Sequence, residues 1–195
     1  MLNLLYLIII SIFCNLIIFL YLKDLHFNFY IINSFLIVLI GSLYFIKLNN
    51  FIIFIFDSVI IALLLVIFYV DRKHMIIPDF ILFLLFCVFL FIKVFNFNFY
   101  KINKEEIKLG IVILMFLMLI HILCLNLLKI EIIGFGDLKL LFIFNLFIGL
   151  NNVLIILFIS SLIACVFEIF ILKRKIFPFG PYLILAYLIV TLLLR

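Results

Sequence analysis

Tryptophan is absent from this chain of 195 residues, proline occurs only three times, and charged residues make up just 12% of it. Hydrophobic residues account for 72% and include 28 phenylalanines. Because soluble globular domains are about 45–50% apolar, this composition excludes a soluble domain. The chain also lacks the alternating segments of about ten residues that mark an outer-membrane β-barrel. Its long apolar runs instead predict an all-α fold, a polytopic transmembrane helix bundle.

Cysteine is also scarce, and the cysteines are scattered through the apolar runs. None belongs to a C-x-x-C pair, and the four stand at Cys14, Cys87, Cys124 and Cys165. These spacings exclude a zinc site and a disulfide framework. The thiols are therefore predicted to be packing residues, and no metal is expected.

The N-terminus lacks the features of a cleaved secretion signal, because no basic segment precedes the first apolar run and no small-residue cleavage site precedes Lys23. At about 20 residues per span, the apolar runs predict eight spans, within a range of six to eight. They are Leu2–Leu22, Phe27–Ile46, Phe51–Val70, Phe80–Phe97, Leu109–Leu128, Leu138–Leu150, Val153–Leu172 and Tyr182–Leu194. We expect Asn151-Asn152 to separate the sixth from the seventh. Residues 1–195 are interpreted as a single membrane domain without a separate soluble domain.

The formal net charge of +5 comes from lysines and arginines that flank the apolar runs and form no patch. The expected partner is therefore the lipid bilayer and not a nucleic acid. With eight spans, one side carries Lys23, Arg72, Lys73, Lys129, Lys139, Lys173, Arg174 and Lys175, and the other carries Lys47, Lys93, Lys101, Lys104, Lys108 and Arg195. The positive-inside rule assigns the richer side to the cytoplasm.

Two acidic residues stand at the ends of apolar runs. Asp137 closes the tetrapeptide Gly134-Phe135-Gly136-Asp137, and Asp71 directly follows Val70. A carboxyl group near hydrocarbon loses hydration, so it persists where it faces a water-filled cavity, a partner or a substrate. With eight spans both acids lie on the cytoplasmic side, and we predict that they meet there as a functional site.

The apolar run after Asp137 is short. Leu138–Leu150 would extend only about 20 Å as a helix, whereas the hydrocarbon core is about 30 Å thick. This difference predicts that Gly134 to Asp137 lies slightly below the membrane surface, in a hydrated recess where irregular backbone is allowed.

Two carboxyl groups that share a proton titrate as a unit and can act as an aspartic protease. One activates water for attack on a peptide carbonyl, and the other hydrogen-bonds the carbonyl oxygen, without metal or cofactor. Asp137 is expected to cap a helix and favour its ionised form, and Asp71, at a helix C-terminus, to favour its protonated form. Which of them is the base stays open. Gly134 and Gly136 would let the substrate backbone approach.

Three further charged residues lie near these ends. Asp79, directly after Pro78, is predicted to be a helix N-cap, and Lys139 to anchor its helix at the headgroups. Glu168 is expected to reach the basic cluster Lys173-Arg174-Lys175.

Three landmarks together resemble the type IV prepilin peptidases, membrane aspartic proteases of the GxGD group. They are Asp71-Arg72-Lys73-His74-Met75-Ile76-Ile77-Pro78-Asp79, Gly134-Phe135-Gly136-Asp137-Leu138-Lys139-Leu140 and Pro178-Phe179-Gly180-Pro181-Tyr182. The resemblance implies that Asp71 and Asp137 are the catalytic pair and that the enzyme works at the cytoplasmic face of the plasma (inner) membrane. It implies a prepilin-like precursor as substrate, with a short basic leader ending in glycine. Supporting or substrate-binding roles would fall to Gly134, Gly136, Lys139, Pro78, Asp79, Pro178, Gly180 and Pro181.

The chain departs from many members of that family, because only Leu22 to Phe27 separates the first two predicted spans. The C-x-x-C domain associated with N-methylation has no place there, so peptidase activity without methyltransferase activity is expected. One alternative is a protease resembling presenilin, although Pro178-Phe179-Gly180-Pro181 stands where that group has Pro-Ala-Leu. Another is a small ion-coupled transporter, although no inverted repeat is found. A homo-oligomer is compatible with each of these functions.

Overall fold

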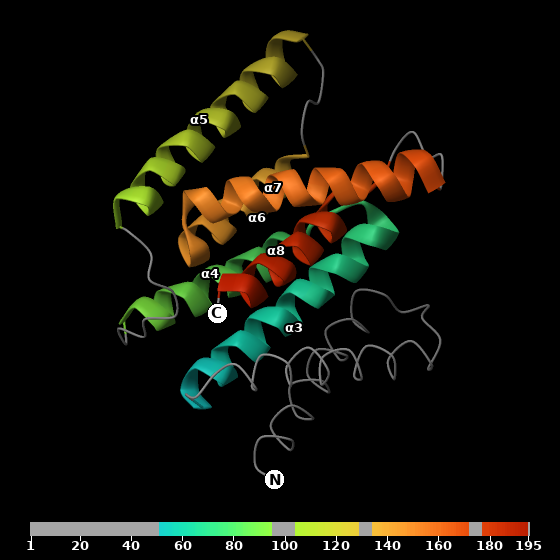
Figure 1. The fold of residues 1–195 in the computed structure, drawn as a ribbon. Helices are drawn as coiled ribbons and strands as arrows, with labels where there is room; N and C mark the ends of the chain where they lie inside the picture. Colours follow the sequence, from blue (N-terminus) through green and yellow to red (C-terminus); the bar gives the residue numbers. More distant parts are fainter. Residues whose placement is uncertain (1–50, 95–103, 129–133, 172–176, 195) are drawn as a thin grey trace.

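The computed structural model describes residues 51–94, 104–128, 134–171 and 177–194 (Figure 1). The elements in these ranges are all helical. They are α3 (Phe51–His74), α4 (Asp79–Val94), α5 (Lys104–Leu128), α6 (Phe135–Ile148), α7 (Leu150–Ala164), the π-helix η1 (Cys165–Ile171) that continues α7, and α8 (Gly180–Leu194). The predicted all-α fold is therefore confirmed for the described part of the chain.

The six later predicted spans fall largely in the described ranges, and each corresponds to a helix. Several helices extend into polar sequence, since α3 continues past Val70 to His74 and α5 begins at Lys104. If these helices ended with the apolar run, their terminal backbone groups there would lack hydrogen-bond partners within the helix. The predicted spans Leu2–Leu22 and Phe27–Ile46 lie outside the described residues, so the count of eight stays a prediction.

The predicted break at Asn151-Asn152 was wrong, because α6 ends at Ile148 and α7 begins at Leu150. Between them Gly149 has φ 80° and ψ 165°, a conformation that glycine reaches without steric cost. Asn152 is already helical, and its side-chain amide donates to the carbonyl of Ile148 at 2.7 Å. This side chain therefore satisfies a carbonyl at the end of α6 without interrupting α7.

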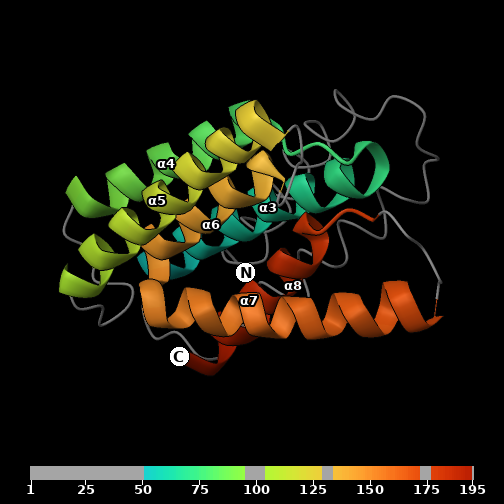
Figure 2. The same cartoon turned by 90° about the horizontal axis from the view of Figure 1, so that it is seen from above.

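The centre of the bundle consists of α6 and α8. The first packs against α4, α5, α7 and α8, and the second packs against α3, α6 and α7 (Figures 1 and 2). Phe144 of α6 stacks on Tyr187 of α8, with ring centroids 4.3 Å apart. Phe147 of α6 meets Phe89 of α4 edge-on, with centroids 5.6 Å apart. These contacts hold α6 against α8 and α4.

A glycine allows α5 to approach α6 closely. A Cβ atom on Gly110 would overlap the side chain of Asn145, which is fully buried. The Asn145 amide donates to the backbone carbonyl of Ile107 at 3.1 Å and so joins the two helices. Small residues at a helix crossing allow such contacts between apolar helices.

The connection between α3 and α4 is a tight turn of four residues, 75–78. Met75 has φ 55°, and its N–H donates to the carbonyl of Asp71 at 2.8 Å. This left-handed cap usually contains glycine, and another residue adopts it at about 1–2 kcal/mol. The carbonyl of Pro78 then accepts hydrogen bonds from the N–H groups of Ile81 and Leu82, which begins α4. The turn therefore places the end of α3 next to the start of α4.

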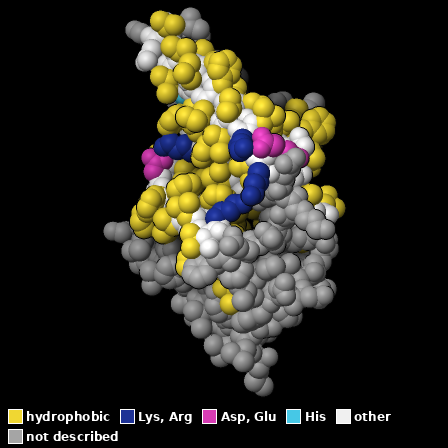
Figure 3. Space-filling model, turned by 90° about the vertical axis from the view of Figure 1, so that its left-hand side faces the viewer, with side chains coloured by type: hydrophobic (Ala, Val, Ile, Leu, Met, Phe, Trp, Pro, Cys, Tyr) yellow, Lys and Arg dark blue, Asp and Glu magenta, His cyan; other side chains and the backbone are white. Residues whose placement is uncertain are grey.

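Two of the described helices are long and apolar enough to cross a membrane, judged by length and composition: Lys104–Leu127 and Leu150–Glu168. Both expose large apolar side chains, such as Val112 and Phe158. In Figure 3, hydrophobic side chains predominate among the described residues, with a few Lys, Arg, Asp and Glu side chains between them. Soluble proteins rarely expose apolar patches of this kind over long helices, so the surface is suited to contact with lipid.

Candidate functional site

Asp71 lies in the last turn of α3 and is only 4% exposed. The backbone N–H of Gly180, at the start of α8, donates a hydrogen bond to its carboxylate. A Cβ atom on residue 180 would lie 2.5 Å from Oδ2 and 3.2 Å from Cγ of Asp71. The acid can therefore occupy this position because residue 180 has no side chain.

The start of α8 explains why the Gly180 N–H is available. The carbonyl of Phe179 accepts the N–H groups of Tyr182 and Leu183, at 3.0 and 3.2 Å, so Phe179 is the N-cap of this helix. The first N–H groups of a helix have no partner within it, and Pro181 has no N–H at all. Gly180 thus supplies the donor that remains, and α8 directs it at Asp71. Pro178 lies buried just before this helix.

Asp137 lies in the first turn of α6, three residues after the N-cap Gly134. Its N–H donates to the carbonyl of Gly134 at 3.0 Å, which is one of the first hydrogen bonds of the helix. A Cβ atom on Gly134 would lie 2.8 Å from Oδ2 of Asp137. The absence of this side chain leaves room for the carboxylate next to the helix start.

Ile77 joins the two acidic helix ends and was not predicted as a site residue. Its buried side chain lies against both Gly136 and Gly180, where Cβ atoms would come within 3.0 Å of Ile77 Cβ and 3.3 Å of its Cδ1, respectively. The turn after Asp71 therefore packs between the starts of α6 and α8. The only sequence signal for this role is a pair of isoleucines inside a polar stretch.

Both acids lie beyond the apolar stretches of their helices, and burial raises the pKa of each. The pKa of Asp71 rises from 3.8 to about 6, although the Gly180 N–H acts in the opposite direction. The pKa of Asp137 rises to about 7, because of burial and because the negative charge of Asp71 lies nearby. The structure thus brings the two predicted acids close enough for their charges to interact.

The expected ionised form of Asp137 was wrong, whereas the expected tendency of Asp71 toward its protonated form agrees with its raised pKa. Asp137 was expected to favour the ionised form as a helix cap, but the N-cap of α6 is Gly134, and burial raises the pKa of Asp137. Asp71 instead has a donor, the N–H of Gly180, which stabilises its carboxylate. This hydrogen bond therefore opposes the effect of burial on Asp71.

Asp79 and Lys139 form an ion pair that joins α4 to α6. Lys139 Nζ lies 2.6 Å from Asp79 Oδ1 and 4.7 Å from the centroid of the Phe135 ring. Asp79 was expected to be the N-cap of its helix, which is wrong, because the Pro78 carbonyl accepts the first hydrogen bonds of α4. Asp79 is the first helical residue and holds the lysine beside the Gly134–Asp137 segment.

This ion pair is expected to contribute modestly to stability. Its side chains are 32% (Lys139) and 75% (Asp79) exposed, so solvent screens their attraction. In a double-mutant cycle of Lys139→Met and Asp79→Asn, measured by thermal unfolding of the purified protein, we expect a coupling energy of about 0.5 kcal/mol. High salt should reduce it. A coupling that is unaffected by salt would contradict the assignment of a screened surface pair.

Glu168 and Tyr182 lie beside the site, and neither was predicted as a site residue. The Tyr182 hydroxyl donates to Glu168 Oε1 at 2.5 Å. The cluster Lys173-Arg174-Lys175, which Glu168 was expected to reach, lies outside the described residues. Among the described residues, no group of three or more His, Cys, Asp or Glu side chains could hold a metal ion.

A model of the type IV leader peptidase family matches residues 58–169. The chain belongs to the type IV leader peptidase family. The match covers more than half of the chain and includes both Asp71 and Asp137. This membership confirms the resemblance to prepilin peptidases and makes the chain a leader-peptidase-type protease, a hydrolase. No match was found among curated proteins or among solved structures.

The matched segment of this leader peptidase family ends before Pro178. The third landmark, Pro178 to Tyr182, therefore takes its connection to the site from the structure alone, through the contact between Gly180 and Asp71. Of the predicted site residues, Gly134 adjoins Asp137, and Gly136 lies against Ile77. Pro78, Asp79 and Lys139 join the starts of α4 and α6.

Proposed function

We propose that this protein is a membrane aspartic endopeptidase that removes the leader peptide from type IV prepilin-like precursors. Asp71 and Asp137 activate the attacking water, and neither metal nor cofactor takes part. The observation that carries this proposal is the pairing of two buried acids with raised pKa values inside a segment that matches leader peptidases. Acids of this kind gather at catalytic sites.

The unequal surroundings of the two acids suggest their starting roles. Asp71, with its charge stabilised by the Gly180 N–H, takes a proton from water as the oxygen attacks the peptide carbonyl. Asp137, which keeps its proton to higher pH, hydrogen-bonds the carbonyl oxygen and assists departure of the amine. The roles exchange as protons return during the turnover.

The proposed setting is the plasma (inner) membrane, with several spans and with the two acids at the cytoplasmic face. Exposed apolar side chains along α5 and α7 support embedding in lipid. The position of both acids at helix ends supports cleavage near the membrane boundary, where the leader of a precursor meets its hydrophobic helix.

The test is direct cleavage of a precursor. The purified full chain in detergent is incubated with a peptide that contains a basic leader, a glycine and the start of a hydrophobic helix, and products are analysed by mass spectrometry. Cleavage after the glycine, insensitive to metal chelators, supports the proposal. An intact peptide under conditions in which the protein is folded would reject it.

The proposed pair also predicts a pH profile. Activity requires one ionised and one protonated acid, and the pKa values are about 6 for Asp71 and about 7 for Asp137. We therefore expect kcat/KM to be bell-shaped with its maximum between pH 6 and 7, and to fall by about tenfold per pH unit well outside this range. Initial rates across pH 4–9 measure it. A profile that rises steadily to pH 9 would contradict a shared proton.

A further inference from the structure

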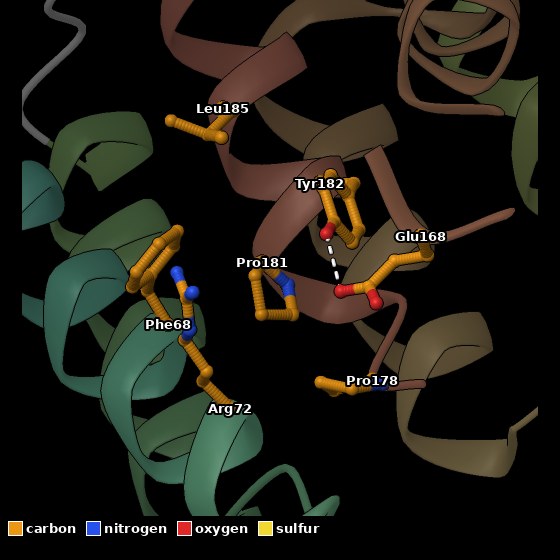
Figure 4. Close-up of a pocket in the computed structure, with 7 residues that line it drawn as sticks. All are labelled: Phe68, Arg72, Glu168, Pro178, Pro181, Tyr182 and Leu185. Atoms are coloured by element: carbon orange, nitrogen blue, oxygen red, sulfur yellow. Dashed lines mark hydrogen bonds between the residues drawn. The ribbon is translucent and has the colours of Figure 1, made fainter. Parts of the chain in front are cut away.

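A small cavity of about 30 Å³ lies between α3, η1 and the start of α8 (Figure 4). Its lining residues come from α3, η1 and the start of α8: Phe68, Arg72, Glu168, Pro178, Pro181, Tyr182 and Leu185. Arg72 directly follows Asp71 in the sequence, and Pro181 directly follows Gly180. Two lining residues are therefore chain neighbours of Asp71 and Gly180, and neither proposed catalytic acid lines the cavity.

Glu168 contributes a buried carboxylate to this cavity. The residue is 4% exposed, and Oε1 accepts the hydroxyl of Tyr182. Its other oxygen, Oε2, is buried and has no hydrogen-bond partner in the described part of the chain. An unpartnered buried carboxylate oxygen is costly, so a hydrogen-bond donor is expected to complete it.

Arg72 lines the opposite wall, beside Phe68 and across Pro181 from Glu168 (Figure 4). No ion pair between Arg72 and Glu168 is formed in the structure, and the Arg72 side chain is exposed. A hydrogen-bond donor other than Arg72 can therefore bind Glu168 Oε2 in this cavity.

The size and the walls of the cavity define which donor fits. A volume of about 30 Å³ is enough for one or two waters, and a primary ammonium group is of similar size. Phe68, Pro178 and Leu185 offer apolar surface for a methylene chain next to the carboxylate. A lysine side chain has this combination of an aliphatic stem and a charged tip.

We propose that Glu168, held by Tyr182, is a specificity residue that binds a primary ammonium group of the peptide substrate next to the scissile bond. The group belongs to a lysine side chain. This inference rests on the proposed function, because it places the cavity next to a cleavage site.

The first test measures binding without cleavage. The full-length Asp137→Asn protein is titrated with a fluorescent peptide that carries lysine near the cleavage junction, and with a matched peptide that carries norleucine. We expect the lysine peptide to bind about tenfold more tightly or better, and the additional change Glu168→Gln to remove this difference. Both peptides carry an acetylated amino terminus, so that the lysine side chain is the ammonium group in which they differ. The matched control is Glu106→Gln, on α5, which should keep the preference.

The second test measures cleavage by the otherwise unchanged protein. Glu168→Gln is expected to lower kcat/KM for the lysine peptide to the value for the norleucine peptide, through KM, and to leave the norleucine peptide unaffected. Tyr182→Phe should weaken the preference in part.

The two tests separate the inference from the proposed function. Binding that depends on Glu168 without any cleavage supports the ammonium site and rejects the protease. Cleavage with the same lysine preference in wild type and Glu168→Gln, or with none in wild type, overturns the ammonium site alone. Absence of a lysine preference in the wild type would mean that Glu168 binds a water or pairs with a cation of this chain.

Discussion

Replacing either Asp71 or Asp137 by asparagine is expected to lower kcat/KM for precursor cleavage by about 10³-fold or more. Asparagine keeps the size and the hydrogen-bonding capacity of the side chain but cannot exchange a proton with water. Because the two acids act as a unit, the double variant should be no slower than the slower single variant. Single-turnover cleavage of a precursor peptide, followed by mass spectrometry, measures all three rates.

Thermal unfolding of the same variants distinguishes lost chemistry from lost folding. Burial raises the pKa of each acid from 3.8, to about 6 for Asp71 and about 7 for Asp137. Between pH 4 and 7 the folded protein therefore binds more protons than the unfolded chain, and its stability falls as pH rises. The asparagine variants avoid this loss, so their Tm relative to wild type should be higher at pH 8 than at pH 5. Glu106→Gln is the control, with wild-type rate and pH dependence. An inactive variant that is also less stable at pH 8 would point to a structural role.

Gly180→Ala is the second change with a large expected effect. The new Cβ atom would lie 2.5 Å from Asp71 Oδ2, which is far too close. A carboxylate at the end of a short side chain can rotate away, so we expect the protein to fold and the acid to move. Misplacement by about 1 Å can cost 10²-fold in rate, and kcat should fall by about this factor with little change in KM.

The pH profile of Gly180→Ala provides an independent readout. A displaced Asp71 no longer accepts the N–H of residue 180, so its pKa rises further and the acidic limb of the profile shifts to higher pH. Ile189→Ala, at an exposed position of the same helix, should leave rate and profile unchanged. Wild-type kinetics in Gly180→Ala would show that Asp71 does not need its observed position.

The lengths of the apolar runs were sufficient to predict the helices in the described ranges. A segment that crosses the hydrocarbon core must form its backbone hydrogen bonds within itself, and a helix does so. The tetrapeptide with Asp137 and the turn after Asp71 could be singled out because acids are rare in such sequence. Their proximity could be expected from loop parity, and the structure places them within electrostatic reach of each other.

Other features depend on three-dimensional contacts that no sequence pattern carries. The break at Gly149 was missed because a pair of asparagines is a stronger local signal than a single glycine. The raised pKa of Asp137 was missed because it depends on burial and on the charge of Asp71, which lies more than sixty residues earlier in the chain. Glu168 was missed because its surroundings combine η1, α3 and the start of α8.

The short turn 75–78 acts as a spacer of fixed length. The left-handed conformation of Met75 sets the path of the turn. The buried side chain of Ile77 then lies in the narrow gap between Gly136 and Gly180. One inserted or deleted residue would rotate Ile77 out of that gap and separate the end of α3 from the starts of α6 and α8. Homologous chains can therefore vary the side chains of this segment far more freely than the number of residues in it.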